Sequence, residues 1–191
     1  MIGELLHFRR NAILLASVLA VALISAFAQR NGVDPTLLAK ATSGDARSQV
    51  AVGETFAAGN GVAQDYKQAS EWYRKAAEQG DVSGEVHLAG LYRDGKGVSQ
   101  DMKQAADWYT KAAEQGDPQA QGTLGVLYAM GQGVPHDDIE AYYWLDLAAA
   151  VKGPDQEKYL ANRQNIGTRI TADELAAIQE REARWKAAHP R

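Results

Sequence analysis

The feature that most constrains the fold of this chain is a sequence repeat. The stretch Glu71–Asp81 (EWYRKAAEQGD) returns 36 residues later as Asp107–Asp117 (DWYTKAAEQGD), and the same period relates positions through most of the chain. A fixed period of this size indicates a repeat architecture, in which one unit cannot bury its own apolar face and must stack on its neighbours. The sequence therefore predicts a stack of similar units.

Each unit has the pattern of two helices joined by a short turn. In its second half, Ala69, Trp72 and Ala76 fall on one helical face, and Leu88 and Leu91 do so in the first half of the next unit. The large tryptophans are expected in the core between layers. Positions that are identical in three copies include Gly59, Gly95 and Gly131; Gly61, Gly97 and Gly133; Val62, Val98 and Val134; Asp65, Asp101 and Asp137; Ala69, Ala105 and Ala141; Trp72, Trp108 and Trp144.

Recurring aspartates and glycines mark the ends of the predicted helices. Because a carboxylate accepts hydrogen bonds from unpaired helical N–H groups, we expect N-caps at Asp45, Asp81 and Asp117 for the first helices and at Asp65, Asp101 and Asp137 for the second. Capping boxes are expected where Gln68, Gln104 and Glu140 follow the second set by three residues. One or both glycines of each Gly-x-Gly-Val turn should have a positive φ. Glu71 and Lys75 are predicted to form an i, i+4 ion pair.

The segment Leu88–Asp117 has the pattern LAxxYxxGxGVxxDxxxAxxWYxKAAEQGD and resembles the Sel1-like repeat, a relative of the tetratricopeptide repeat. The resemblance covers about residues 45–152. It implies an all-α fold, a right-handed α/α solenoid, and a role in protein–protein contacts as an adaptor or regulator. The third copy departs from the pattern after Trp144, as terminal repeats do. The predicted segments are a linker at 29–36, a solenoid at 37–153 (cap helix 37–44; repeats 45–80, 81–116 and 117–153) and C-terminal capping helices at 154–191.

The N-terminal residues 1–28 have the features of a signal peptide. Arg9 and Arg10 precede an apolar run over residues 12–28, which ends in the small-x-small triplet Ala26-Phe27-Ala28 of a cleavage site. The run also lies at the lower length limit of a membrane span, so an uncleaved inner-membrane anchor is the alternative. Both alternatives export the rest of the chain, because the arginines should stay on the cytoplasmic side. We therefore expect a periplasmic or secreted domain, which would contact the membrane only through an uncleaved anchor.

The sequence offers few groups for catalysis or cofactor binding. The chain has no cysteine, which excludes disulfides, thiolate metal sites and thiol nucleophiles. His87, His136 and His189 do not recur with the repeat and lack the i, i+4 spacing of a zinc site, so we expect them to face solvent. A net charge of −4, with basic residues scattered among acidic ones, argues against nucleic acid as a partner. We expect no enzymatic activity, no cofactor and no metal.

Function is expected where the copies of the repeat differ. In a solenoid the first helices of the units line a concave face, and partners are recognised by its non-recurring side chains. The candidate partner-contact residues are Glu54, His87, Arg93, Thr123 and Ala129. The leading hypothesis is a monomeric adaptor, scaffold or regulator of a protein partner in the cell envelope. The alternative is a peptidoglycan-binding or wall-acting, hydrolase-like protein, although the resembling proteins linked to β-lactam hydrolysis are rich in cysteine.

Overall fold

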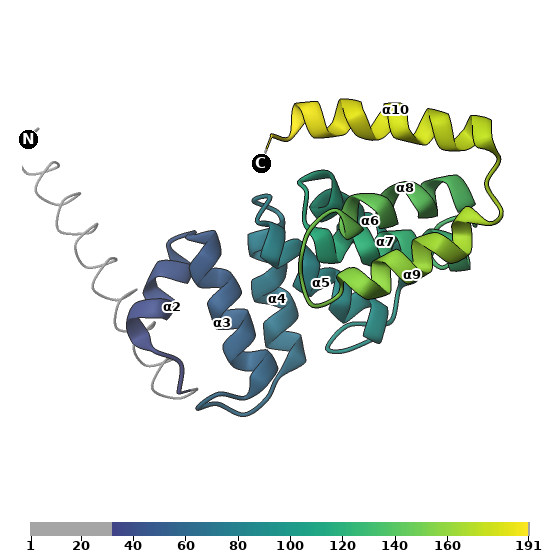
Figure 1. Ribbon diagram of the computed structural model, residues 1–191. Helices are drawn as coiled ribbons and strands as arrows, with labels where there is room; N and C mark the ends of the chain where they lie inside the picture. Colours follow the sequence, from purple (N-terminus) through teal and green to yellow (C-terminus); the bar gives the residue numbers. More distant parts are fainter. Residues whose placement is uncertain (1–31, 191) are drawn as a thin grey trace, which may run out of the picture.

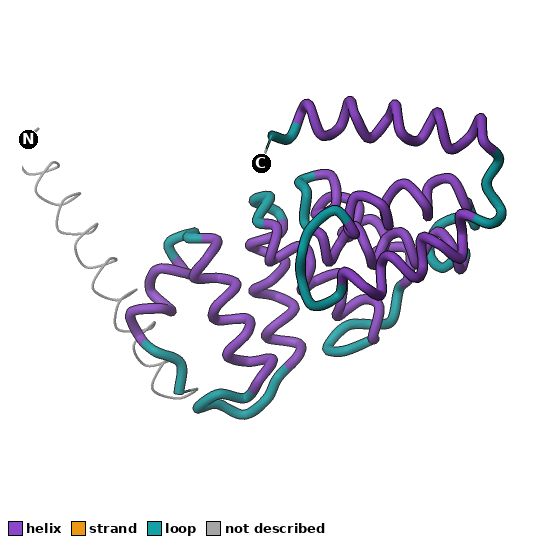
Figure 2. The backbone as a smooth tube through the Cα atoms, viewed as in Figure 1, coloured by secondary structure: helices purple, strands orange, loops and turns teal. Residues whose placement is uncertain are grey.

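The computed structural model describes residues 32–190, which form a row of helices joined by short turns (Figure 1). These residues contain no strand (Figure 2), so the predicted all-α solenoid class is confirmed. The signal peptide or anchor predicted at 1–28 lies outside the described residues, as does the start of the predicted linker. Val33, in the described part of that linker, is buried against the core. The helices are α2 (Pro35–Thr42), α3 (Ala46–Ala58), α4 (Tyr66–Ala77), α5 (Val82–Asp94), α6 (Met102–Glu114), α7 (Pro118–Met130), α8 (Asp138–Ala149), α9 (Gln156–Gly167) and α10 (Ala172–Ala188).

Each repeat is a helical hairpin with a first helix, A, and a second helix, B. The A helices are α3, α5 and α7, and the B helices are α4, α6 and α8. Contacts are concentrated between helices that are consecutive in the chain, and α3 also touches α5. Such nearest-neighbour packing lets the core run continuously along the row, as in a solenoid.

Aspartate caps begin both helices of every repeat. The carboxylate of Asp117 accepts a hydrogen bond from the backbone N–H of Ala120, 2.7 Å away, at the start of α7. The carboxylate of Asp137 accepts from the N–H groups of Ile139 and Glu140, at 2.9 and 3.0 Å, at the start of α8. These bonds satisfy backbone donors that have no partner inside the helix. Equivalent caps lie at Asp45, Asp65, Asp81 and Asp101.

The capping boxes predicted for the B helices do not form. A capping box needs the backbone N–H of the cap residue as a donor, but in Asp101 this group donates to the carbonyl of Tyr92, 3.0 Å away at the end of α5. The side-chain amide of Gln104 instead donates to the Asp101 carboxylate at 3.3 Å. In the described part of the chain a capping box joins Thr171 and Glu174 at the start of α10.

Both glycines of each Gly-x-Gly turn have a positive φ, between 65° and 75°. The first one, such as Gly131, ends an A helix in the left-handed conformation. The second one lets the turn touch the preceding repeat. A Cβ on Gly133 would lie 2.0 Å from the carbonyl oxygen of Met102 in α6, and a Cβ on Gly97 would lie 2.2 Å from that of Tyr66 in α4. The turn glycines therefore hold adjacent repeats together as well as shaping the hairpin.

The tryptophans of the B helices are not all core residues. Trp72 and Trp144 are buried, whereas Trp108 is half-buried. The ammonium group of Lys75 lies over the Trp72 ring, 4.0 Å from its centroid. No ion pair joins Lys75 to Glu71 in the described residues, because the lysine contacts the ring instead. The expected i, i+4 pair is therefore wrong.

The last two helices take different places in the row. Helix α9 packs on α8 and also touches α7, in the position of a further A helix. Helix α10 makes its main contacts with α8 (Figure 1). Its Ile178 is buried, and its Arg181 pairs with Glu140 and lies over the Tyr143 ring, 3.8 Å from the centroid. Helix α10 therefore covers the outer surface of the last B helix.

This cover explains part of the divergence of the third repeat. Tyr143 and Leu147 of α8 are 2% and 1% exposed. The equivalent positions in the earlier copies, 36 and 72 residues before, carry charged and exposed side chains: Glu71 and Asp107 for the first position, Lys75 and Lys111 for the second. The third copy has apolar residues there because they face α10 instead of water.

We expect Gly133→Ala to destabilise the protein by about 3 kcal/mol, because a side chain there meets both an unfavourable φ and the Met102 carbonyl. Urea unfolding followed by circular dichroism measures the change. The matched control is Gly153→Ala, where a Cβ meets nothing within 4 Å; its effect should stay within about 0.5 kcal/mol. Equal midpoints for the two variants would contradict the proposed role of the turn.

Candidate interaction surface

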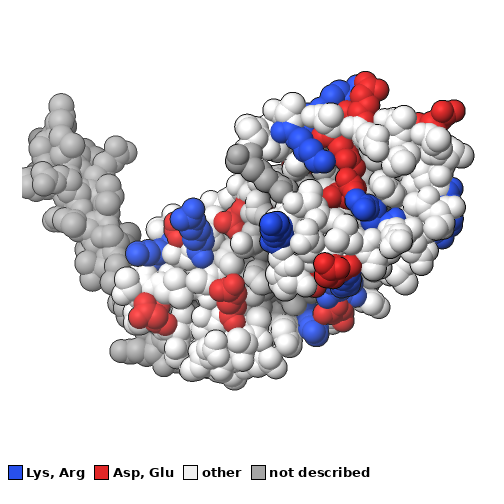
Figure 3. Space-filling model, viewed as in Figure 1, with Lys and Arg blue, Asp and Glu red and all other residues white. Residues whose placement is uncertain are grey.

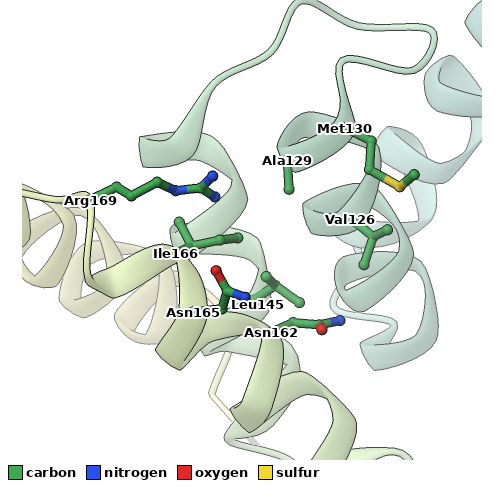
Figure 4. Close-up of a pocket in the computed structure, with 8 residues that line it drawn as sticks. All are labelled: Val126, Ala129, Met130, Leu145, Asn162, Asn165, Ile166 and Arg169. Atoms are coloured by element: carbon green, nitrogen blue, oxygen red, sulfur yellow. The ribbon is translucent and has the colours of Figure 1, made fainter.

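Three hollows along the A helices join into one groove, named the A groove below. The first, of about 260 Å³, lies between α3 and α5. The second, of about 430 Å³, lies between α5, α7 and α9, and the third, of about 230 Å³, between α7 and α9 (Figure 4). Arg93 and Gln119 line both the first and the second hollow, and Val126 and Asn162 line both the second and the third. The A groove thus extends along most of the solenoid.

Glu54 and His87 meet at the first hollow. The Nε2 atom of His87 lies 3.3 Å from a carboxylate oxygen of Glu54. The imidazole stacks on the ring of Tyr73, with centroids 4.7 Å apart and an angle of 18° between the planes. Gly53 of α3 makes room for this tyrosine, since a Cβ there would lie 2.6 Å from the ring. His87 is half-buried in this stack, so the prediction that it simply faces solvent is only partly right.

Arg93 is held between the first and second hollows. Its Nε lies 2.8 Å from the Asp94 carboxylate, and its Nη1 donates to the Tyr109 hydroxyl at 3.3 Å. Tyr109 is buried, and this burial raises the pKa of its hydroxyl, so the group stays a neutral hydrogen-bond partner. The guanidinium is therefore positioned by α5 and α6 together while remaining open to the groove.

Thr123 and Ala129 lie further along, where α7 faces α9. Thr123 lines the second hollow together with Arg93, and Ala129 lines the third. Helix α9 comes close here because Gly122 has no side chain: a Cβ at Gly122 would lie 2.1 Å from the ring of Tyr159. Four of the five candidate residues thus line the A groove in chain order, and Glu54 lies beside it against His87. Their contact with a partner stays a prediction.

Sequence reasoning missed the contribution of α9 to this surface. Lys158, Tyr159 and Asn162 line the second hollow, but the segment 154–191 was expected to serve only as a cap. A signal was present, because Gly167 and Ile170 lie one period after Gly131 and Val134. Extending the repeat through these positions makes α9 an A helix and places its inward residues in the groove.

Two buried carboxylates are candidates for a catalytic group, because a perturbed pKa is common in active sites. Burial raises the pKa of Glu85, whose carboxylate accepts a hydrogen bond from the Gln115 amide at 2.9 Å. Glu182 lies between α10 and α8. Neither residue lines one of the three hollows.

In residues 32–190 no group of three or more His, Asp or Glu side chains could hold a metal ion.

Acidic and basic side chains are interspersed on the face displayed in Figure 3. Nucleic-acid binding needs basic residues that gather in one area, and this face does not have such an area.

Within residues 32–190, none of the helices combines the length and the apolar character needed to cross a membrane.

The sequence matches the Sel1 repeat in three places, at residues 46–81, 83–117 and 118–150. The chain belongs to the Sel1-repeat family. Sel1 repeats are generally protein-interaction modules, and a long groove such as the A groove suits that role. No curated protein is significantly similar to the chain.

Solved structures of Sel1-repeat proteins are similar to this chain. A protective antigen of uropathogenic Escherichia coli strains, which displays an SLR fold, is 34% identical, with a TM-score of 0.67 over 77% of this chain and 31% of the antigen. The chain therefore spans about a third of the length of that protein. A Sel1 repeat protein from Oxalobacter formigenes is 35% identical, with a TM-score of 0.61 over 66% of this chain and 96% of the other. The cysteine-rich protein B of Helicobacter pylori shares the fold. It is 22% identical, with a TM-score of 0.51 over 65% of this chain and 94% of its own.

The Glu182 carboxyl sets a pH dependence for the docking of α10. Burial, followed by the neighbouring Asp146 carboxyl, raises the pKa of Glu182 from 4.5 to about 7. One carboxylate oxygen lies 3.3 Å from the ammonium of Lys186, and the other is buried without a partner among the described residues. The folded chain therefore holds a proton that the unfolded chain releases between about pH 4.5 and 7. The stability contributed by this group falls as the pH rises through that window.

We expect Glu182→Gln to remove this loss of folding stability at higher pH, because a neutral amide replaces the titrating carboxyl group. The variant should gain about 1–3 kcal/mol over the natural chain as the pH rises from 4.5 to 8, measured as the difference in unfolding free energy at each pH. The control is Glu180→Gln on the same helix, where the side chain is 72% exposed. A pH-independent difference for Glu182→Gln would contradict this account.

Proposed function

We propose that this protein is an exported, non-enzymatic interaction module that binds a protein partner in the A groove. The observation that carries the proposal is the groove itself. Its lining gathers residues that differ between the copies of the repeat, while the residues that recur form caps, turns and core. Groove residues that vary between the copies, held on helices and turns that stay the same, suit recognition of a specific partner.

The N-terminal segment supports a location outside the cytoplasm. Its basic and apolar composition, with Ala26-Phe27-Ala28 at the end, supports export through a cleaved signal peptide or an uncleaved anchor. The partner is then a protein of the cell envelope, met on the periplasmic side. Because α2 packs against α3 at one end and α9 packs against α8 at the other, the first and last helices of the three repeats are covered, which supports a monomer.

The test is crosslinking in the native cell from a photoreactive residue placed at Thr123, inside the groove. We expect a discrete protein adduct, identified by mass spectrometry. The control is the same residue at Asp107, which is exposed on the B helix α6. An adduct formed equally well from Asp107, or an adduct with peptidoglycan in place of protein, would contradict the proposal.

Charge reversal in the groove gives an independent test. The double variant Arg93→Glu with Glu54→Lys should weaken capture of the crosslinked partner roughly ten-fold in a pull-down, because both side chains are partly exposed in or beside the first hollow. Helicity measured by circular dichroism should not change. If capture is also unchanged, the partner does not use this part of the groove.

A further inference from the structure

The end of the A groove between α7 and α9 carries four carboxamide side chains. Gln119 and Gln132 line the second hollow, Asn165 lines the third, and Asn162 lines both. None of these carboxamides hydrogen-bonds to another group in residues 32–190. In Figure 4, Asn162 extends from α9 toward α7, and the carboxamide of Asn165 lies beside Leu145. A carboxamide offers both donors and an acceptor, which is what the main chain of a peptide needs.

These side chains favour an extended occupant over a helical one. The main-chain N–H and C=O groups of a helix are already paired within the helix. An extended segment has unpaired groups along its whole length, and these must find partners when water is removed. Open carboxamides on both walls of the groove can supply such partners.

The floor of the third hollow is apolar. Val126, Ala129 and Met130 of α7 face Leu145 and Ile166 across it (Figure 4). Met130 is 59% exposed, and is one of two large hydrophobic residues that stand out as exposed in the described part of the chain. A hollow of this kind gains stability when an apolar side chain covers it.

The basic side chains that line the second and third hollows outnumber the acidic ones. Arg93 and Lys158 line the second hollow and Arg169 the third, against one acidic lining residue, Asp155. The chain as a whole carries a net charge of −4. Arg93 and Arg169 are each also bound to an aspartate, at 2.8 Å, but Lys158 has no acidic side chain within 4 Å among residues 32–190. Lys158 therefore offers a free positive charge to an occupant.

We propose that the α7–α9 end of the A groove binds an extended peptide segment in which acidic side chains neighbour one large apolar side chain. The carboxamides hold the main chain, Lys158 and Arg93 meet the carboxylates, and the third hollow takes the apolar side chain. The proposal rests on the proposed function and names the chemistry of the partner segment.

Fluorescence anisotropy with synthetic peptides tests this chemistry on the purified full-length chain. The probe is a labelled, end-capped Gly/Ser peptide containing Glu-Glu-Gly-Leu, compared with versions that carry Gln or Lys in place of Glu and Ala in place of Leu. We expect the Glu and Leu peptide to bind about ten-fold more tightly than any of the three others at low salt, and its advantage over the Gln peptide to shrink at high salt. Equal affinities, or no binding of any peptide, would overturn the proposal.

Variants locate the site. Lys158→Glu should abolish the preference for Glu over Gln and favour the Lys peptide, while Asn162→Ala with Asn165→Ala should weaken the Glu and Gln peptides by the same factor, about five-fold. The matched control is Lys40→Glu on α2, an exposed lysine at the other end of the row, which should leave all affinities unchanged. An effect of Lys40→Glu equal to that of Lys158→Glu would show a general charge effect and overturn the site.

The outcomes separate this inference from the proposed function. A protein adduct from Thr123 together with no peptide preference overturns the inference and leaves the function standing. Absence of an adduct from Thr123 counts against the function itself, whatever the peptides show. All variants are at exposed or half-buried positions and can be checked for unchanged helicity before binding is measured.

Discussion

The hairpin of each repeat depends on one backbone hydrogen bond. The N–H of the aspartate that caps a B helix donates to a carbonyl near the end of the A helix: Asp65 to Phe56 at 2.9 Å, Asp101 to Tyr92 at 3.0 Å and Asp137 to Tyr128 at 3.1 Å. The bond closes a turn in which both glycines have a positive φ, a conformation that glycine adopts without steric cost. The same aspartate then caps the B helix with its carboxylate. One residue therefore fixes the end of one helix and the start of the next, and the groove follows from repeating this geometry.

The C-terminal part of the chain shows what happens when that geometry is lost. Gly167, Ile170 and Asp173 keep the period of 36 residues, but Arg169 stands where Gly133 stood one period earlier. The regular turn brings Gly133 so close to the preceding B helix that no Cβ fits, so a turn with an arginine cannot form in the same way. Gly167 correspondingly lacks a positive φ. Helix α10 starts from a cap at Thr171 instead and packs across α8.

The helices, caps and turns of the repeats can be predicted well from the sequence, and the interaction surface and the place of α10 less well. The repeat explains both outcomes. Caps and turn glycines can be located from sequence because they use local hydrogen bonds and local φ values, and their recurrence in three copies separates them from chance. The placement of α10 depends on contacts between residues that are far apart, such as Arg181 with Glu140, and local patterns do not contain it. A comparison between the copies of the repeat does give part of the information on where α10 packs: Asp107 is replaced by Tyr143, and Lys111 by Leu147. The change from charged to apolar on one helix surface indicates that something covers it.

The same comparison separates packing from recognition at buried polar positions. Gln49 and Gln121 donate their amides to the carbonyls of Ala41 and Ala113, at 3.0 and 3.1 Å, and so tie each A helix to the preceding helix. Glu85 holds the equivalent position in the middle repeat, where it accepts from Gln115 as Gln49 accepts from Gln79, but its carboxylate has no amide to donate to the preceding helix. This difference between copies is buried, so it reflects packing. The carboxamides of Gln119, Asn162 and Asn165 also differ between copies, but they lie open in the groove. Divergence indicates recognition only where the divergent side chain remains available to a partner.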